Sequence, residues 1–369
     1  MNETSPPTSE ADNIACSVTE GFAEWISGLG GSILISTYQA GRVALIGWNG
    51  QQVTMHLSHF PRPMGMALQG NRLAMAIERR VMFFEHSQVM AESFPTIGPD
   101  SLPVGDEPGG YDCCYLPRMS YESGPLDLHD LAFGDEGLWL VATQFSCIAQ
   151  LSPHCSFVPQ WFPPFITQSV PEDRCHLNGL ALMNGKPRFV TALGETDTPR
   201  GWRANKASGG VLMDVAENRV VLRGLAMPHS PRWHEDRLWF LNSAAGELCV
   251  VEPGSNRYSV VALLSGFLRG LCFAGPYAMV GLCKLRSSRT FGSLPLELRF
   301  PELKCGVAAI HRQTGQLAAM LEFTQGCDEL YDVQFLPGYS RPVLLNDQQM
   351  SRLYPVITPQ QGYLISRNE

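Results

Sequence analysis

The sequence lacks an excess of positive charge and a long apolar run. It has 27 Lys and Arg against 35 Asp and Glu residues, a formal net charge of −8. Such a chain is not attracted to phosphate backbones or anionic lipid, so we expect neither nucleic acid nor a membrane as a partner. No stretch approaches the roughly 18 consecutive apolar residues that a membrane-spanning helix requires. Residues 1–19 also lack the basic start and apolar core of a signal peptide.

Common catalytic motifs are missing as well. The chain contains no GxSxG, no P-loop, no HExxH and no GxGxxG at a strand-to-helix turn, so nucleotide hydrolysis and the usual serine or zinc hydrolase chemistry lack support. Long helices are disfavoured because 35 glycines and 27 prolines interrupt nearly every segment. The eleven cysteines are odd in number and irregularly spaced, which predicts reduced thiols and a cytoplasmic location rather than a disulfide framework.

A seven-residue pattern occurs six times along the chain. Each copy is apolar at its seventh place, apolar at its fifth except for one proline, small or acidic at its fourth, and usually polar or ring-bearing at its third. The copies occupy residues 62–68, 127–133, 176–182, 227–233, 267–273 and 329–335. Each heptad is followed by a turn and a second apolar run, as in a blade of antiparallel strands.

The repeat predicts an all-β fold, a β-propeller of four-stranded antiparallel blades around a central channel. A further hairpin at 32–48 precedes the first heptad, and 342–356 is counted as the last of seven hairpins. We therefore favour seven blades, with six as the alternative. We expect a disordered tail at 1–19, a single propeller domain at 20–357, and at 358–369 a tail or a ring-closing strand.

One face of this propeller is the predicted working face. In an antiparallel blade the inner strand begins where the second strand ends, so the third heptad places and the polar second-strand exits share one end of the channel. Four long insertions, at 93–126, 157–175, 194–210 and 285–304, open on the same end. Long loops and converging polar groups on a rigid scaffold are typical of a ligand-binding or catalytic site.

Histidines and carboxylates are the candidate catalytic residues. His129 and His229 occupy the third heptad place, and His176 begins another heptad. The three imidazoles are candidate ligands of a divalent metal or, without metal, candidate acid–base groups, and Asp130, Glu195, Asp197 or Asp332 is the candidate carboxylate beside them. The alternative is that these side chains only bond the backbone of neighbouring blades.

Other residues of the same heptads and loops are candidate ligand-binding groups. Arg269, followed by Gly270, suits an anion, and the charged loop at 193–210 suits a carboxylate, phosphate or sugar. The ligand-binding candidates are Arg62, Asn178, Trp202, Arg203, Arg269, Tyr331 and Asp332. We expect the partner to be a small molecule, a sugar or a peptide.

Several long blocks of this chain resemble an uncharacterised bacterial family of hypothetical proteins, a domain of unknown function. These blocks include STYQAGRV, HLNGLAL, ALGETDTPRGWR, GLAMPHSPRWH and ELYDVQFLPG, and the likeness covers about residues 20 to 355. The resemblance implies a propeller-like fold and a bacterial cytoplasmic setting, and it assigns no catalytic residues. The functional hypotheses are an enzyme of the channel mouth, a carbohydrate- or peptide-binding module, and an interaction scaffold.

Overall fold

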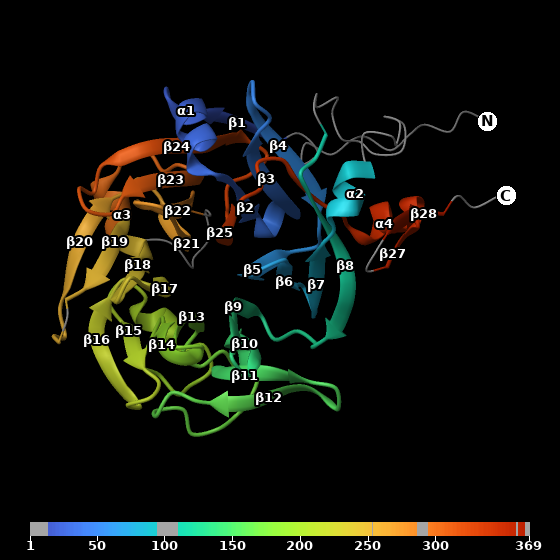
Figure 1. Ribbon diagram of the computed structural model, residues 1–369. Helices are drawn as coiled ribbons and strands as arrows, with labels where there is room; N and C mark the ends of the chain where they lie inside the picture. Colours follow the sequence, from blue (N-terminus) through green and yellow to red (C-terminus); the bar gives the residue numbers. More distant parts are fainter. Residues whose placement is uncertain (1–13, 94–109, 253, 286–293, 359–360, 366–369) are drawn as a thin grey trace, which may run out of the picture.

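The computed structural model describes residues 14–93, 110–252, 254–285, 294–358 and 361–365. Parts of the predicted tails (1–13 and 366–369) and of two predicted insertions (94–109 and 286–293) lie outside the described residues. The described residues form a ring of six antiparallel sheets, so the predicted β-propeller is confirmed (Figure 1).

The innermost strand of every blade comes from one of the six heptads. From blade 1 to blade 6 these strands are β25 (Asp332–Pro337), β5 (Pro63–Gln69), β9 (Leu128–Gly134), β13 (Leu177–Met183), β17 (Pro228–His234) and β21 (Phe267–Ala274). Each inner strand packs against those of both neighbouring blades, which gathers residues distant in sequence around one axis (Figure 1).

Three further strands complete each blade outward. Blade 1 adds β2 (Gly31–Ser36), β3 (Arg42–Trp48) and β4 (Val53–His59), and blade 2 adds β6 (Arg72–Ile77), β7 (Arg80–His86) and β8 (Cys113–Glu122). Blade 3 adds β10 (Gly137–Ala142), β11 (Cys147–Ser152) and β12 (Cys155–Trp161), and blade 4 adds β14 (Lys186–Ala192), β15 (Gly210–Asp214) and β16 (Arg219–Leu225). Blade 5 adds β18 (Arg237–Asn242), β19 (Glu247–Val251) and β20 (Tyr258–Leu263), and blade 6 adds β22 (Tyr277–Cys283), β23 (Gly306–His311) and β24 (Leu317–Gln325).

The ring has six blades, so the preference for seven was wrong and the alternative of six holds. The first hairpin, β2 and β3, takes its inner strand from the last heptad, because β25 pairs with β2 from Gly31↔Pro337 to Ser36↔Asp332. The segment counted as a seventh hairpin instead forms the short strand β26 (Pro342–Leu344) and helix α4 (Asp347–Leu353). Asn346 caps that helix by accepting a hydrogen bond from the Gln349 N–H.

Segments near both ends of the described chain add outer strands. β1 (Ala15–Val18) pairs antiparallel with β24, although the sequence placed it in a tail, and β26 pairs parallel with β8. The C-terminal strand β28 (Gly362–Leu364) pairs with β27 (Pro355–Ile357), so it does not close the ring. Other short elements are α1 (Phe22–Leu29), α2 (Gln88–Ser93), α3 (Pro295–Arg299), η2 (Tyr38–Ala40), η5 (Thr143–Phe145), η6 (Gly201–Asn205) and η7 (Ser243–Ala245). In the described part of the chain, no helix combines the length and apolar character needed to cross a membrane.

The fourth heptad place alternates between a polar side chain and glycine around the ring. In order from blade 1 to blade 6 it holds Asp332, Gly65, Asp130, Gly179, Ser230 and Gly270. Each polar side chain accepts a backbone N–H of the next blade: Met66 donates to Asp332, Leu180 to Asp130 and Gly270 to Ser230, at 2.9, 2.9 and 3.1 Å. A Cβ at Gly179 would lie 2.3 Å from Pro231 Cδ, so the backbone is too close there for any side chain.

Candidate functional site

A cavity of about 260 Å³ lies at the end of the channel where the inner strands begin. The third heptad places contribute Met64, His129, Arg269 and Tyr331, and the second-strand exits contribute Tyr38 and Gln144. The predicted sharing of one face by these two groups is therefore confirmed. The loops before β13 and after β14 complete the wall with Asp173, His176, Leu193, Arg200, Trp202 and Arg203, and Asp127, Met227 and Glu329 also line it.

His176 is held by a buried carboxylate on the wall of this cavity. Its Nδ1 lies 2.9 Å from Asp173 Oδ1, and the Trp202 indole N–H donates to Asp173 Oδ2 at 3.0 Å. The His176 and Trp202 rings lie 4.5 Å apart. His176 has a φ of 52°, a left-handed conformation that is costly for a non-glycine residue and common at functional sites. Two neighbours thus fix the orientation of one imidazole.

His129 is the nearest ionisable neighbour of His176. The two ring centroids are 4.7 Å apart, edge to face, and His129 Nδ1 lies 2.8 Å from the Asp127 carbonyl oxygen. Nδ1 therefore carries the ring proton in the neutral form and donates it to that oxygen. Burial and the adjacent His176 lower the pKa of His129 well below its usual range. His129 is thus an uncharged ring at neutral pH.

His229 does not line this cavity, but it lines a small adjoining cavity together with His129. His229 Nδ1 lies 2.9 Å from the Met227 carbonyl oxygen, and burial and Arg269 lower its pKa well below the ordinary value. Among the described residues, no three His, Cys, Asp or Glu side chains are grouped closely enough to hold a metal ion. The geometry does not support the predicted three-histidine metal centre, because His129 and His176 line the mouth cavity whereas His229 does not reach its wall.

Glu195 and Asp197 do not reach the cavity wall. Glu195 receives two hydrogen bonds from the exposed Arg223, at 2.7 and 3.1 Å. Asp197 connects the loop that follows β14 to the loop that precedes β13, because it accepts hydrogen bonds from Arg174 at 2.8 Å and from the Thr167 hydroxyl at 2.5 Å. The predicted pairing of these two carboxylates with the histidines was wrong, and Asp173 occupies that role instead.

The cavity wall holds three carboxylates and three arginines, and two of the arginines form no ion pair among the described residues. Each acidic side chain has a partner: Asp173 binds His176, Gln144 donates to Asp127 at 3.0 Å, and Glu329 lies 3.1 Å from Arg269 Nη1. In the described ranges, Arg200 and Arg203 form no ion pair, and the Arg203 guanidinium lies 5.3 Å from the Trp202 ring centroid. The predicted ligand-binding residue Arg62 lies at the rim, where it donates to the Tyr38 hydroxyl at 2.6 Å.

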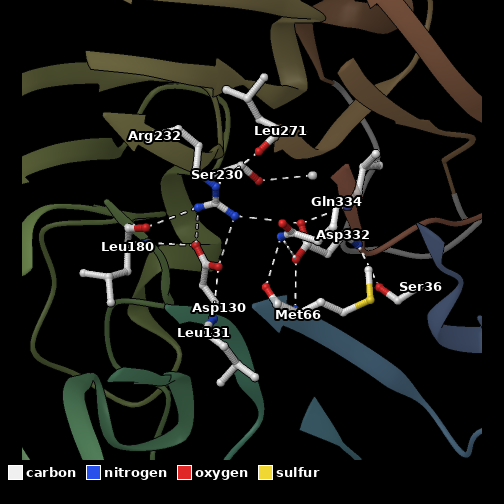
Figure 2. Close-up of polar contacts among 12 residues, drawn as sticks. Ser36, Met66, Asp130, Leu131, Leu180, Ser230, Arg232, Leu271, Asp332 and Gln334 are labelled. Carbon is white, nitrogen blue, oxygen red and sulfur yellow. Dashed lines mark hydrogen bonds and ion pairs between the residues drawn. The ribbon is translucent and has the colours of Figure 1, made fainter. Parts of the chain in front are cut away.

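Below the cavity, Arg232 of blade 5 contacts blades 1, 3, 4 and 6 on the channel axis (Figure 2). Its Nη1 lies 2.7 Å from Asp130 Oδ2 of blade 3, and its Nη2 lies 3.8 Å from Asp332 Oδ1 of blade 1. Burial opposes the charge of Arg232, but the two carboxylates outweigh it and raise the arginine pKa. Burial raises the pKa of Asp332 to about 6, against the lowering effect of Arg232. The predicted ligand-binding residue Asp332 therefore belongs to a network that closes the channel.

A larger cavity, of about 650 Å³, lies at the opposite end of blades 5 and 6. Its lining includes His234, Trp239 and Arg312, but Arg312 already forms two hydrogen bonds with Glu235, at 2.6 and 3.0 Å. Its lining comes from only these two blades, whereas the mouth cavity collects ionisable side chains from around the ring. We therefore regard the mouth cavity as the candidate site.

Sequence reasoning missed four charged residues of the channel: Asp127, Asp173, Arg232 and Glu329. Asp127 and Glu329 occupy the first heptad place, which the column of third places left out. The sixth heptad place holds a small residue in four of the six copies. The arginine at 232 departs from this pattern, so the sequence alone could have singled it out. Asp173 lies three residues before the heptad that begins at His176, and no repeat or motif of the sequence includes it.

Comparison with known proteins agrees with this architecture. The family described as Domain of unknown function (DUF4915) matches residues 20–345. The chain belongs to this family. The match to DUF4915 begins just before α1 and ends just after β26, so it spans all six blades.

Solved structures extend the comparison of this DUF4915 chain at the level of fold. A chain of the "Crystal structure of Nidogen/Laminin Complex" is similar with a TM-score of 0.52 and 9% sequence identity, over 84% of this chain and 99% of that chain. Such low identity shows a shared propeller fold and nothing about activity. No curated protein matches the chain.

Proposed function

We propose that the mouth cavity binds a small organic acid and that His176 moves a proton to and from it. The observation that carries the proposal is the Asp173–His176 pair, in which Nδ1 lies 2.9 Å from the carboxylate on the cavity wall. A carboxylate that accepts the Nδ1 proton fixes the ring and stabilises the imidazolium, so that Nε2 can accept a proton. The Trp202 indole keeps the carboxylate in place.

Two arginines supply the charge that an acid requires. Arg200 and Arg203 line the cavity without an ion pair among the described residues, and a guanidinium binds a carboxylate in bidentate fashion. A carboxylate neutralised by arginine makes the C–H bond next to it more acidic, because the negative charge that develops on proton removal is stabilised. The described wall holds no serine, threonine or cysteine, so it favours proton transfer over nucleophilic catalysis.

The size of the cavity restricts the ligand. At about 260 Å³ it lies just below the roughly 300–1,000 Å³ of typical sites for drug-sized ligands. Trp202, Tyr38 and Tyr331 provide flat apolar surfaces beside the charged groups. A compact molecule with one charged end and a carbon framework fits both the small volume and the apolar ring surfaces.

We place this activity in the cytoplasm or another reducing compartment. All eleven cysteines are free, and ten of them are buried or partly buried. Burial raises the pKa of Cys147 and Cys175 to about 12, so neither is a reactive thiolate. Reduced, unreactive thiols are the expected state in a compartment rich in glutathione.

Deuterium exchange tests the proposed proton transfer without knowledge of the product. The protein is incubated in D₂O with D-gluconate, D-glucuronate, D-galacturonate, pyruvate or cyclohexanecarboxylate, and the C–H signals next to the carboxyl or carbonyl group are followed by proton NMR. We expect exchange with at least one acid, reduced about 100-fold or more in His176→Gln. Asp173→Asn slows it as well, whereas Arg223→Gln, a change at an exposed ion pair, leaves it intact.

Two outcomes contradict the proposal. If an acid binds, as measured by calorimetry, but no C–H exchanges, the cavity is a binding site without catalysis, the alternative that a carbohydrate- or peptide-binding propeller represents. If exchange persists unchanged in His176→Gln, the base is another residue.

A further inference from the structure

Four buried polar atoms without a protein partner surround the channel just below the mouth cavity. They are Asn178 Nδ2, His229 Nε2, Arg269 Nε and Tyr331 OH, and none has a hydrogen-bond partner among the described residues. The four side chains are at most 9% exposed and come from four different blades, each from the third heptad place. Unpartnered buried polar atoms are rare in folded proteins, and four at one place indicate a group that completes them.

These four side chains line a small cavity that forms the floor of the mouth. Its volume is about 10 Å³, close to the roughly 10–15 Å³ that one water molecule needs on this measure. His129, Arg269 and Tyr331 line both this cavity and the mouth cavity, so the two adjoin along the axis. An atom of a ligand in the mouth can therefore reach the floor.

The four unpartnered atoms are two donors, one acceptor and a hydroxyl that can donate or accept. Asn178 Oδ1 already accepts the Thr191 hydroxyl at 2.7 Å, so its amide nitrogen is the donor left over. Arg269 Nε also donates, and the Tyr331 hydroxyl can donate or accept. His229 Nδ1 lies 2.9 Å from the Met227 carbonyl oxygen and 3.0 Å from Ser243 Oγ; since the carbonyl can only accept, we assign the ring proton to Nδ1, which leaves Nε2 as an acceptor. Burial and Arg269 lower the His229 pKa, and this keeps the acceptor unprotonated at neutral pH.

A hydroxyl oxygen suits this set better than an anion or a cation. A carboxylate oxygen or chloride accepts hydrogen bonds but would face the lone pair of His229, and a cation would face Arg269. A hydroxyl oxygen has two lone pairs, so it accepts bonds from Asn178 and Arg269 and donates its own hydrogen to His229. We infer that the channel floor is a subsite for one hydroxyl group of the ligand, a position that a water molecule takes in the free protein.

The inference deepens the proposed function and rests on it. With Arg200 and Arg203 at the mouth and a hydroxyl subsite on the floor, the ligand class is a hydroxylated organic acid such as a sugar acid. Its carboxylate meets the arginines, and a hydroxyl at its other end enters the channel between Asn178 and His229.

Calorimetric titration with two ring acids tests the subsite. D-glucuronate carries hydroxyl groups and cyclohexanecarboxylate carries none, and we expect the wild-type protein to bind D-glucuronate at least ten-fold more tightly. Tyr331→Phe removes one polar group of the floor and keeps the ring, so it should weaken D-glucuronate binding about ten-fold and leave cyclohexanecarboxylate binding unchanged. Tyr115→Phe is the matched control, because the Tyr115 hydroxyl is also buried and unpartnered but lies outside both cavities.

Equal affinity of the wild-type protein for the two acids overturns the subsite, as does an unchanged D-glucuronate affinity in Tyr331→Phe. So does the absence of an ordered oxygen between Asn178, His229 and Tyr331 in a high-resolution crystal structure of the free protein. Failure of the proposed function is distinguishable from this. If only an unhydroxylated acid exchanges deuterium and the exchange requires His176, the proposed proton transfer is supported and the hydroxyl subsite is contradicted. If D-glucuronate binds more tightly than cyclohexanecarboxylate but no acid exchanges deuterium, the hydroxyl subsite is supported and the proton transfer is contradicted.

Discussion

Arg232 Nη1 lies 2.7 Å from Asp130 Oδ2, although the two residues are 102 positions apart in the chain. The bond crosses the propeller from blade 5 to blade 3, and the same guanidinium faces Asp332 of blade 1. Asp130 and Asp332 also accept backbone N–H groups of blades 4 and 2, and Arg232 Nε donates to the Leu271 carbonyl of blade 6 at 3.2 Å, so one arginine is coupled to all six blades. The axis is thereby held by charge and hydrogen bonds rather than by apolar packing.

Arg232→Met should destabilise the fold strongly. The variant leaves two buried carboxylates without their cation, and breaking a buried ion pair in this way costs about 3–5 kcal/mol. Urea unfolding followed by tryptophan fluorescence measures the change. Arg219→Met is the control, because its ion pair with Glu217 is about half exposed on both sides, and it should unfold like the wild-type protein. Equal midpoints for Arg232→Met and Arg219→Met would contradict the coupling role.

Gly179→Ala should also destabilise the protein, by about 1–3 kcal/mol. The added Cβ would lie 2.3 Å from Pro231 Cδ and 2.6 Å from Thr191 Oγ1, so blades 4 and 5 must move apart. Gly28→Ala, in helix α1, places its Cβ where no atom lies within 4 Å and should raise stability slightly through helix propensity. Thermal unfolding of the two variants compares them directly, and a neutral effect at Gly179 would show that the close approach of the blades is not needed.

The stability difference between the wild-type protein and His229→Gln should shrink as the pH falls below about 6.5. In the folded state burial holds the His229 pKa well below that value, whereas the unfolded chain takes up the proton. Below about pH 6.5, His229 therefore lowers the free energy of unfolding of the wild-type protein by about 1.4 kcal/mol per pH unit. The variant has no imidazole at this position, so its stability does not include this decrease. Urea unfolding at pH 7.0, 6.0 and 5.0 gives the difference, and a constant difference would mean that His229 protonates in the folded protein.

Arg200→Gln and Arg203→Gln should each weaken the binding of D-glucuronate about ten-fold, because a charged hydrogen bond to the carboxylate is lost. The wild-type affinity should fall as salt rises from 20 to 300 mM, and fall less steeply in either variant. Arg223→Gln removes the same charge from a residue engaged by Glu195 and serves as the control. Calorimetry at the two salt concentrations measures the affinity of the wild-type protein and the three variants. Equal salt dependence in all four proteins would exclude Arg200 and Arg203 as the acid-binding groups.

The sequence was sufficient to predict the propeller and the face of its site, because both follow from the period of the heptads. The third heptad places did assemble with the second-strand exits, as His129 and Tyr331 meet Tyr38 and Gln144 in one cavity. The blade number was misjudged because 342–356 was read as a hairpin, although Asn346 and Gln349 have the spacing of a helix capping box.

The remaining errors concern side-chain partners, which a repeat pattern does not specify. Glu195 and Asp197 stand in the same loop as Trp202, yet the loop turns both carboxylates toward Arg223 and Arg174. Asp173 and His176 both adopt left-handed conformations, with φ of 50° and 52°, and the backbone between them turns so that the two side chains meet. Such local geometry depends on the packed structure, and one sequence alone did not reveal it.

The pairing of β25 with β2 sets an order of events during synthesis. The first three strands of blade 1 leave the ribosome early, whereas their inner partner follows almost 300 residues later. Until then the edge of β2 exposes unpaired backbone groups, and the nascent chain is open to pairing with other proteins. A ribosome that stalls before residue 332 releases a chain whose first blade lacks its inner strand. Such a chain cannot close the ring and keeps an exposed strand edge, so we expect it to aggregate or to be degraded.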